Sequence, residues 1–234
     1  MKELPPKRRI KVPVSLDRAD LEPIAESLGR IAELRSRSRD FDREVAALDG
    51  AGWDDNGLGG GDRAKNEDNA IGAAIMECYR LTGQCKVNWA KRYILNLLAE
   101  NPKAKVLVFA HHKHVLDSIH QELNDEKIRA IKIDGSVASE KRHDVATDFQ
   151  TNMKTRVAVL SITAAGAGLN FTAAQFVVFA ELHMTPGMLL QAEDRAHRIG
   201  QTATSVDVHI LIANGTYDEQ LWEMISKKIG NVTR

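Results

Sequence analysis

The fold is decided by the stretch AKVLVFAHHKHVLDSIHQELNDEKIRAIKI, Ala104–Ile133. It opens with an apolar run of strand length, continues with a helix that we expect to end near Leu123, and closes with a second apolar run, AIKI. Strands that are apolar throughout are typical of parallel sheets with both faces covered, and the helix between them provides the crossover that parallel pairing requires. The stretch therefore predicts one β–α–β unit.

The same alternation continues to the end of the chain. Three more apolar runs, RVAVLSI, QFVVFAEL and VDVHILIA, alternate with helices expected across Ser139–Phe149, around Gln191–Gly200 and from Thr216 onward. Repeated units of this kind predict an α/β fold, with a parallel sheet covered by helices on both faces. Ligands of such sheets bind beyond the carboxyl ends of the strands. The polar clusters HHKH, DGS and ITAAGAGLN each follow a predicted strand.

The chain before this sheet has a different character. From Asp20 to Leu34, apolar residues recur at spacings of three and four, which predicts an amphipathic helix. Six glycines between Asp49 and Asp62 favour a loop, and helices are expected again over Glu67–Arg80 and Val87–Glu100. The predicted organisation is a basic, proline-containing hinge at 1–15, a helical protrusion at 16–50, a flexible glycine-rich loop at 51–66 and an α/β lobe at 67–234.

Composition and charge narrow the classes of function. The 234 residues include 32 basic and 32 acidic side chains, so contact with nucleic acid must use a local patch. No apolar run approaches the roughly 18 residues of a membrane span, and no membrane partner is expected. The histidines of HHKH lack a second cluster of ligands at a plausible spacing, so we expect no metal site. Cys78 and Cys85 fit neither a zinc site nor a C-x-x-C pair, which favours two reduced thiols.

The stretch QAEDRAHRIGQ, Gln191–Gln201, is the clearest candidate for a functional site. Helical periodicity places four polar side chains on one stripe: Gln191, Asp194, Arg195 and Arg198. A neighbouring apolar stripe, expected to pack against the sheet, consists of Leu189, Ala192, Ala196 and Ile199. Asp194 can neutralise Arg198 at a spacing of four. The polar stripe is either a charged face in solvent or a pair of arginine fingers that grip the oxygens of a transferring γ-phosphoryl group.

Taken in chain order, the motifs resemble those of one family, the Swi/Snf-type superfamily 2 DNA-dependent ATPases. Motifs V and VI of that family are similar to SITAAGAGLNFTAAQFVVFAEL followed by QAEDRAHRIGQ, and motif IV is similar to KVLVFAHHKHVLD. The segment after motif IV, the tail of the lobe and the hinge that leaves the first lobe resemble IKIDGSVASEKRHDVATDFQ, VDVHILIANGTYDEQLWEMISKK and ELPPKRRIKVPV. VFAHHKHVLD and FAEL are similar to the HARP-type annealing helicases and their translocase relatives. Met184 and Thr185 stand where Trp-Asn is usual.

The resemblance implies the second, C-terminal RecA-like lobe of a motor that couples ATP hydrolysis to movement along DNA. It implies that Arg195 and Arg198 act as catalytic arginine fingers. The nucleotide would be contacted by Gln191, Gly166, Gly168, Asn170 and Asp194. DNA phosphates would be contacted by His112, Lys113, Ser136, Ser161 and Thr163. The residues themselves also allow a tight turn for the two glycines and a helix-capping role for Ser136.

Two motifs of a complete ATPase are absent from the sequence. It contains no G-x-x-x-x-G-K-[ST] phosphate loop and no D-E-x-H box for Mg²⁺, so we expect the chain to be inactive alone and to need the first RecA-like lobe of the same protein. With that lobe, ATP and Mg²⁺ would be the cofactors, and double-stranded or forked DNA the partner. We expect an annealing helicase or translocase that acts in DNA repair or replication-fork remodelling in the nucleus. A chromatin-remodelling lobe and a non-catalytic DNA-binding module are the alternatives.

Overall fold

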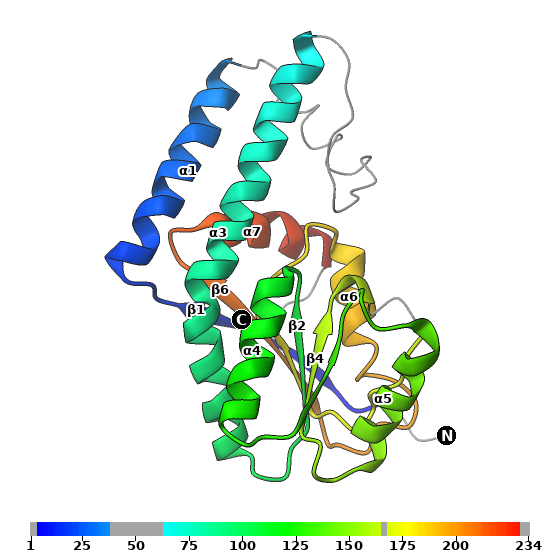
Figure 1. The fold of residues 1–234 in the computed structure, drawn as a ribbon. Helices are drawn as coiled ribbons and strands as arrows, with labels where there is room; N and C mark the ends of the chain where they lie inside the picture. Colours follow the sequence, from blue (N-terminus) through cyan, green and yellow to red (C-terminus); the bar gives the residue numbers. More distant parts are fainter. Residues whose placement is uncertain (1–3, 38–62, 165–167, 230–234) are drawn as a thin grey trace.

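The computed structural model of the chain describes residues 4–37, 63–164 and 168–229. Its centre is a sheet of six strands, all parallel, in the order β1-β6-β5-β2-β4-β3 (Figure 1). The prediction of an α/β fold with a parallel sheet is therefore confirmed. The strands are β1 Lys7–Val14, β2 Val106–Ala110, β3 Ala130–Ile133, β4 Val157–Ser161, β5 Phe176–Phe179 and β6 Val206–Ala213.

Helices cover both faces of this sheet. In β2, Val106 and Val108 point into a core shared with α4 and the end of α3, while Leu107 and Phe109 point into a core shared with α5, α6 and α7. Because successive side chains of a strand point to opposite faces, a strand that is apolar at every position is buried on both. The helices are α1 Arg18–Arg37, α3 Arg63–Glu100, α4 Lys113–Asp125, α5 Ser139–Thr151, α6 Pro186–Glu193 and α7 Tyr217–Ile229.

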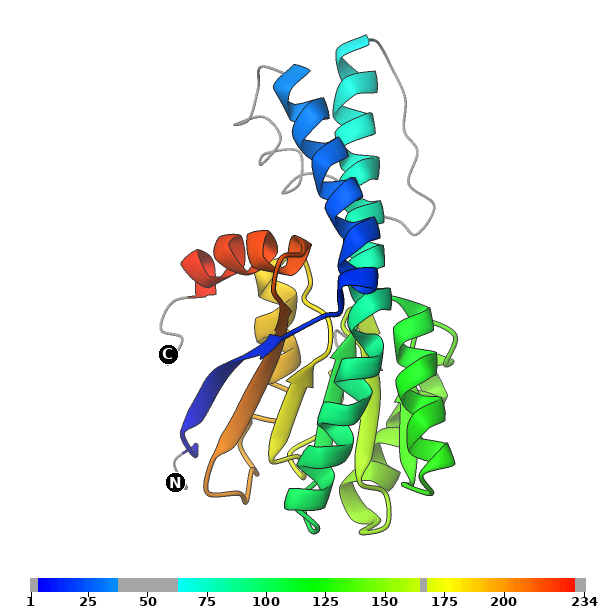
Figure 2. The same cartoon turned by 90° about the vertical axis from the view of Figure 1, so that its left-hand side faces the viewer.

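Helix α1 and the first half of α3 lie side by side and project beyond the carboxyl ends of the strands (Figure 2). Ile24 and Ile31 of α1 are buried in one cluster with Ile71 and Ile75 of α3, so the apolar stripe of α1 packs against its neighbour. Helix α1 occupies the first part of the segment predicted as a protrusion, and 38–50 lie outside the described residues. None of the helices in the described part of the chain is both long and apolar enough to cross a bilayer.

The structure differs from two expectations about the region before β2, and most of a third lies outside the described residues. Lys7–Val14, expected to be a hinge, forms an edge strand that pairs along its whole length with β6. The two helices expected at 67–80 and 87–100 are one helix, α3, because Gly83 between them is buried against Glu181 and leaves the helix unbroken. The predicted loop at 51–66 lies outside the described residues except for 63–66, which belong to α3.

Candidate functional site

The stretch predicted as a helix across Gln191–Gly200 is helical only to its third residue, because α6 ends at Glu193. The turns that follow keep short-range backbone bonds, such as His197 N–H to the Glu193 carbonyl at 3.0 Å, and also make long-range hydrogen bonds. Phe171 donates its backbone N–H to the carbonyl of Arg195 at 3.0 Å, and the side chain of Gln201 donates to the carbonyls of Ala174 and Ala196. The carbonyls of Arg195 and Ala196 thus have long-range partners in place of the amides that a continuing helix would supply.

The predicted apolar stripe is partly right. Leu189, Ala192 and Ala196 are buried as expected. Ile199 is 84% exposed, because it lies beyond the end of the helix and points into solvent.

The four polar side chains of the stretch nevertheless come together. They line one open hollow of about 490 Å³, together with Leu4, His197 and Ile199; the four are Gln191, Asp194, Arg195 and Arg198. Since Leu4 lies three residues before the start of β1 and Lys7 pairs with Asp194, the hollow lies beside the amino end of that strand. The amino end of a parallel strand lies opposite its carboxyl end, so the hollow lies away from the edge where ligands of such sheets were expected.

Arg195 lacks a counter-charge of its own in the described structure. Its Nε atom is buried and has no hydrogen-bond partner. Burial, followed by the neighbouring charge of Arg198, lowers the pKa of Arg195 below its usual value, although Asp194 opposes the shift. Asp194 forms its ion pair with Lys7 at 3.2 Å and not with Arg198, as the helical spacing had predicted, because the helix ends before Arg198. Two adjacent guanidinium groups with little compensation favour an anionic ligand.

The N-terminal segment holds this stretch in place, which the sequence did not reveal. Arg9 forms a two-pronged contact with the Glu193 carboxylate at 2.7–3.1 Å, and Lys7 lies 2.9 Å from the same group. His197 Nε2 lies 2.7 Å from the carbonyl oxygen of Pro5. The available signal was the alternation of Lys7 and Arg9, which places both on one face of a strand.

The glycine-rich segment expected at the nucleotide is adjacent to the arginines. Gly168 is exposed and has a φ of +72°, a conformation that favours glycine, in agreement with a tight turn. The Asn170 side chain accepts the N–H of Thr172 at 3.2 Å, and the next residue, Phe171, bonds to Arg195. Gly166 lies outside the described residues.

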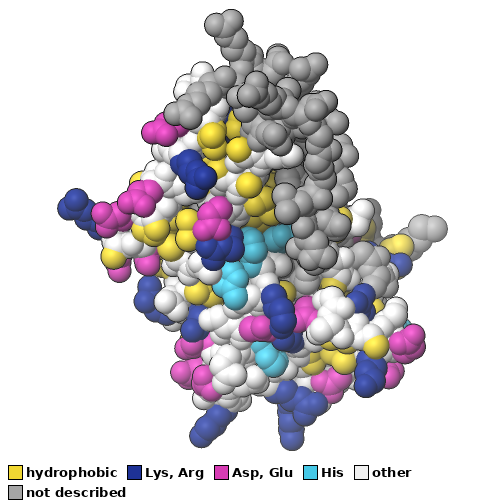
Figure 3. All heavy atoms as spheres, turned by 45° about the horizontal axis from the view of Figure 1, so that its top comes forward, with side chains coloured by type: hydrophobic (Ala, Val, Ile, Leu, Met, Phe, Trp, Pro, Cys, Tyr) yellow, Lys and Arg dark blue, Asp and Glu magenta, His cyan; other side chains and the backbone are white. Residues whose placement is uncertain are grey.

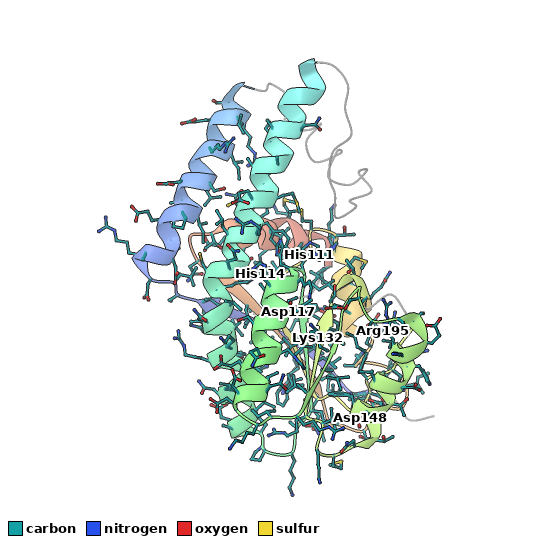
Figure 4. All side chains as sticks on the ribbon, in the orientation of Figure 1. His111, His114, Asp117, Lys132, Asp148 and Arg195 are labelled. Atoms are coloured by element: carbon teal, nitrogen blue, oxygen red, sulfur yellow. The ribbon has the colours of Figure 1, made fainter. Side chains whose placement is uncertain are left out.

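The residues predicted to contact DNA follow three adjacent strands, β2, β4 and β3, and therefore share the carboxyl edge of the sheet. They are His112, Lys113, Ser136, Ser161 and Thr163. The Ser161 and Thr163 hydroxyls lie 2.8 Å apart, and Lys113 pairs with Asp117 at 2.9 Å. Figure 4 shows His111, His114, Asp117 and Lys132 in this region. The arginine hollow and the predicted DNA contacts are thus two separate places on the lobe.

Ser136 does not cap a helix. Its hydroxyl donates to Asp134 Oδ1 at 2.5 Å, and the residue at the N-cap of α5 is Ala138. The capping role that the sequence allowed for this serine is therefore wrong. Neither α4 nor α5 has a side-chain hydrogen bond at its N-cap, so the first amides of both helices remain available to other acceptors.

A buried carboxylate supports the HHKH loop. Glu181, after β5, accepts the backbone N–H groups of His111 and His112 at 2.9 Å each, and its second oxygen lies 2.7 Å from His112 Nδ1. Burial raises the pKa of Glu181, but the hydrogen bonds and charge of His112, with the charge of Lys86, outweigh it and leave the pKa lowered. Figure 3 shows histidines gathered on this face, below the protrusion. The only sequence signal for Glu181 was one acidic residue ending an apolar run.

In the part of the chain that the structure describes, no three His, Cys, Asp or Glu side chains are placed to share a metal ion.

Comparison with known proteins identifies the family. The helicase conserved C-terminal domain matches residues 89–200. A "SWI/SNF-related matrix-associated actin-dependent regulator of chromatin subfamily A-like protein 1" from Xenopus laevis is 50% identical over 156 residues, 67% of this chain and 16% of that protein. The "DNA annealing helicase and endonuclease ZRANB3" of Mus musculus is 39% identical over 228 residues, 97% of this chain and 19% of that protein. The chain is a C-terminal lobe of the Swi/Snf type.

The fold of this Swi/Snf-type lobe agrees with a solved relative. The crystal structure of the C-terminal part of the Fun30 ATPase domain superimposes with a TM-score of 0.68 at 18% identity, covering 96% of this chain and 90% of that one. The lobe spans less than a fifth of the length of the two curated relatives. The matched helicase domain contains Lys113, Arg195 and Arg198, whereas the contacts from Lys7 and Arg9 come from outside it.

Proposed function

We propose that this lobe is the second motor lobe of an ATP-dependent double-stranded-DNA translocase or annealing helicase. The observation that carries the proposal is the hollow in which Arg195 and Arg198 lie side by side, with the Nε atom of Arg195 buried and unpartnered. A guanidinium group held without a counter-ion is poised for an anion that arrives from outside the lobe. The γ-phosphate of ATP, presented by a first RecA-like lobe, has the charge and the planar oxygen geometry that the two forks match.

The roles of the surrounding residues follow from this placement. Arg195 and Arg198 stabilise the charge that spreads over the oxygens of the transferring phosphoryl group. Gln191 and Asp194 share their hollow and contact the nucleotide. Gly168 and Asn170 shortly precede Phe171, which bonds to Arg195, and together with Gly166 they are the remaining proposed nucleotide contacts. The phosphate loop and the ligands of Mg²⁺ come from the first lobe, so the chain alone does not hydrolyse ATP.

DNA lies across the carboxyl edge of the sheet in this proposal. The uncapped amides of α4 and α5, the hydroxyls of Ser136, Ser161 and Thr163, and the exposed ammonium group of Lys113 all suit phosphate oxygens. These groups recognise the backbone and do not distinguish bases, as a motor that moves along DNA requires.

The proposed biological role is based on the names of the relatives. One is called a DNA annealing helicase and is similar over nearly the whole chain, which favours action on forked DNA in repair or replication-fork remodelling in the nucleus. Another is called a regulator of chromatin, which keeps a chromatin-remodelling motor as the second candidate. ATP turnover stimulated by forked DNA supports the first candidate, and turnover stimulated by nucleosomes more than by free DNA supports the second.

The test is steady-state ATPase of the two-lobed protein with saturating DNA, beside thermal melts. Arg198→Ala and Arg195→Ala are each expected to cut turnover by about 10² or more and to leave melting and DNA binding nearly intact. Lysine at either position rescues little, because a point charge cannot reproduce the planar fork. Arg129→Ala is the matched control, since Arg129 pairs with Asp148 on another part of the surface. Normal turnover in both arginine variants would contradict the proposal.

A further inference from the structure

Glu193 is an unusual residue to find at the end of a helix beside two arginines. Its carboxylate is 1% exposed, yet neither Arg195 nor Arg198 pairs with it. Its backbone carbonyl accepts the N–H groups of Ala196 and His197 at 3.1 and 3.0 Å, so it also organises the turn that follows. The residue therefore joins a buried anchor to the turn that carries both arginines.

The anchor is built from the first strand. Arg9 grips Glu193 with both Nε and Nη2, and Lys7 reaches the same carboxylate and Asp194. Lys7 and Arg9 are partly buried on one face of β1, while Arg8, between them, faces the other way and forms its own fork with Asp207. A buried carboxylate that loses such partners is left with an uncompensated charge, so the contact is strongly favoured.

A third contact ties the far side of the turn to the same segment. His197 lies 2.7 Å from the carbonyl oxygen of Pro5, and Leu4 lines the hollow together with Arg195 and Arg198. The three contacts bracket Arg195, two of them just before it in the chain and one just after it. We call Pro5, Lys7 and Arg9 the N-terminal clamp.

We propose that the N-terminal clamp is the positioning element of the arginine pair: by holding Glu193 and His197, it sets where Arg195 and Arg198 stand in the hollow. The proposal rests on the proposed function for its catalytic consequence, but the positioning itself is a property of this lobe. Fingers that act on a transition state must be held to within a fraction of an ångström, because a misplacement of about 1 Å can cost about 10²-fold in rate. Lys7 and Arg9 belong to the edge strand β1 and Pro5 lies just before it, so a shift of this strand is passed to the arginine turn through Glu193 and His197.

The first experiment measures hydrogen exchange in the 234-residue chain, without nucleotide. Arg9→Ala and Glu193→Gln are expected to raise amide exchange at least tenfold in the peptide that spans residues 194–201. Arg8→Ala is the matched control, because it removes a two-pronged arginine contact from the same strand on the opposite face. It is expected to leave residues 194–201 unchanged. Arg9→Lys, which keeps the charge and loses the fork, is expected to fall between wild type and Arg9→Ala.

The second experiment measures ATP turnover in the two-lobed protein. Arg9→Ala and Glu193→Gln are expected to lower kcat by about tenfold or more with little change in KM, and Arg8→Ala to change neither. Should Arg9→Ala melt below the assay temperature, Glu193→Gln, which preserves the shape of the side chain, decides the result. Unchanged amide exchange at residues 194–201 in Glu193→Gln, or an equal rise in Arg8→Ala, would overturn the proposal that the N-terminal clamp positions the arginines.

The two proposals fail in different ways. If Arg198→Ala loses turnover while the clamp variants keep both normal exchange and normal kcat, the clamp is wrong and the function stands. If the clamp variants loosen residues 194–201 while Arg195→Ala and Arg198→Ala keep normal turnover, the positioning stands and the catalytic assignment is wrong.

Discussion

At the scale of single residues, Gly83 shows how closely the sheet edge is packed against α3. A Cβ atom at this position would lie 2.1 Å from Glu181 Oε1 and 3.0 Å from its Cδ. Glu181 cannot easily move aside, because it is buried and holds the HHKH loop through His111 and His112. The glycine therefore gives the carboxylate the space in which it supports that loop.

Gly83→Ala is expected to destabilise the lobe. Helix propensity alone would make alanine more favourable by about 1 kcal/mol, but the overlap with Glu181 should outweigh this and cost a net of about 1–3 kcal/mol. Gly72→Ala, in the same helix with no atom within 4 Å of the new Cβ, is the control and should stabilise by up to about 1 kcal/mol. Chemical denaturation of both variants provides the measurement. Two variants that shift stability in the same direction would show that Glu181 does not require the glycine.

The buried histidine His209 should make the stability of the lobe depend on pH. It lies buried in β6, with its Nδ1 2.7 Å from the Tyr93 hydroxyl, and burial lowers its pKa, with Asp207 opposing and Arg8 reinforcing the shift. The unfolded chain, in which a histidine pKa is about 6.5, then binds more protons than the folded one below that pH. Its contribution to stability is full above about pH 6.5 and is lost as the pH falls toward the lowered folded pKa.

The expected result is a melting temperature that falls from pH 7.5 to pH 5.5, with a shallower fall for His209→Gln. Part of the dependence should remain, because burial also lowers the pKa of His114 and His183. His143→Gln, at an exposed position of α5, is the control and should keep the slope of the unaltered chain. Identical slopes in all three proteins would contradict the assignment to His209.

At the scale of elements, α3 connects the protrusion, the sheet and α7. Its Lys86 is buried and pairs with Asp218 of α7 at 2.5 Å, and it also donates to the carbonyl of Leu211 in β6 at 3.2 Å. Asp218 is fully buried, and burial raises its pKa although the charge of Lys86 acts in the opposite direction. The pair thus fixes where α3 and α7 meet at the end of β6.

Breaking this pair from one side should be costly. Lys86→Met is expected to lower the free energy of unfolding by about 3–5 kcal/mol, because it leaves a buried carboxylate without its cation. Lys86→Met combined with Asp218→Asn should recover part of the loss, since no buried charge then remains. The control is Lys91→Met, which breaks a more exposed pair between α3 and Glu122 of α4 and should cost no more than about 1 kcal/mol. Equal losses from both single variants, measured by urea denaturation, would contradict this account.

At the scale of the whole molecule, the proposed DNA binding requires a local surface, because the chain has zero formal net charge. The parallel sheet brings the ends of β2, β4 and β3 to one edge, where the proposed DNA contacts lie. The arginine hollow lies elsewhere, beside the segment that precedes β1. A two-site lobe of this kind can hold DNA on one edge and meet a nucleotide on another.

DNA binding by the isolated chain should be weak, independent of sequence and strongly dependent on salt. Lys113→Ala is expected to reduce the slope of log affinity against log salt by about 1, because one phosphate contact is lost. Lys227→Ala is the matched control, since Lys227 is as exposed as Lys113 and pairs with a carboxylate at the same helical spacing, on α7. Fluorescence anisotropy between about 50 and 200 mM salt measures the slopes. Equal slopes for both variants would contradict a DNA-binding surface at the HHKH loop.

Much of this protein was determined by its sequence alone. The apolar runs and the helices between them predicted five strands of the parallel sheet, because a strand buried on both faces leaves no alternation. The stretch Gln191–Gln201 was enough to single out Arg195 and Arg198 as candidate site residues, because a sequence motif can be recognised from its own residues alone. Even the wrong prediction of a continuous helix there grouped Gln191, Asp194, Arg195 and Arg198 correctly.

What only the tertiary structure decided are the contacts between distant parts of the chain. Lys7–Val14 is a strand because β6 is beside it, and its basic character by itself suggested a hinge. Helix α6 ends at Glu193 because Phe171 and Gln201 supply other partners, which helical periodicity cannot foresee. Arg9 and Glu193 lie 184 positions apart, so their pairing leaves no local pattern. The periodicity of apolar side chains predicts which face of a helix or strand is buried. Which other helix or strand covers that face is decided only when the whole chain packs.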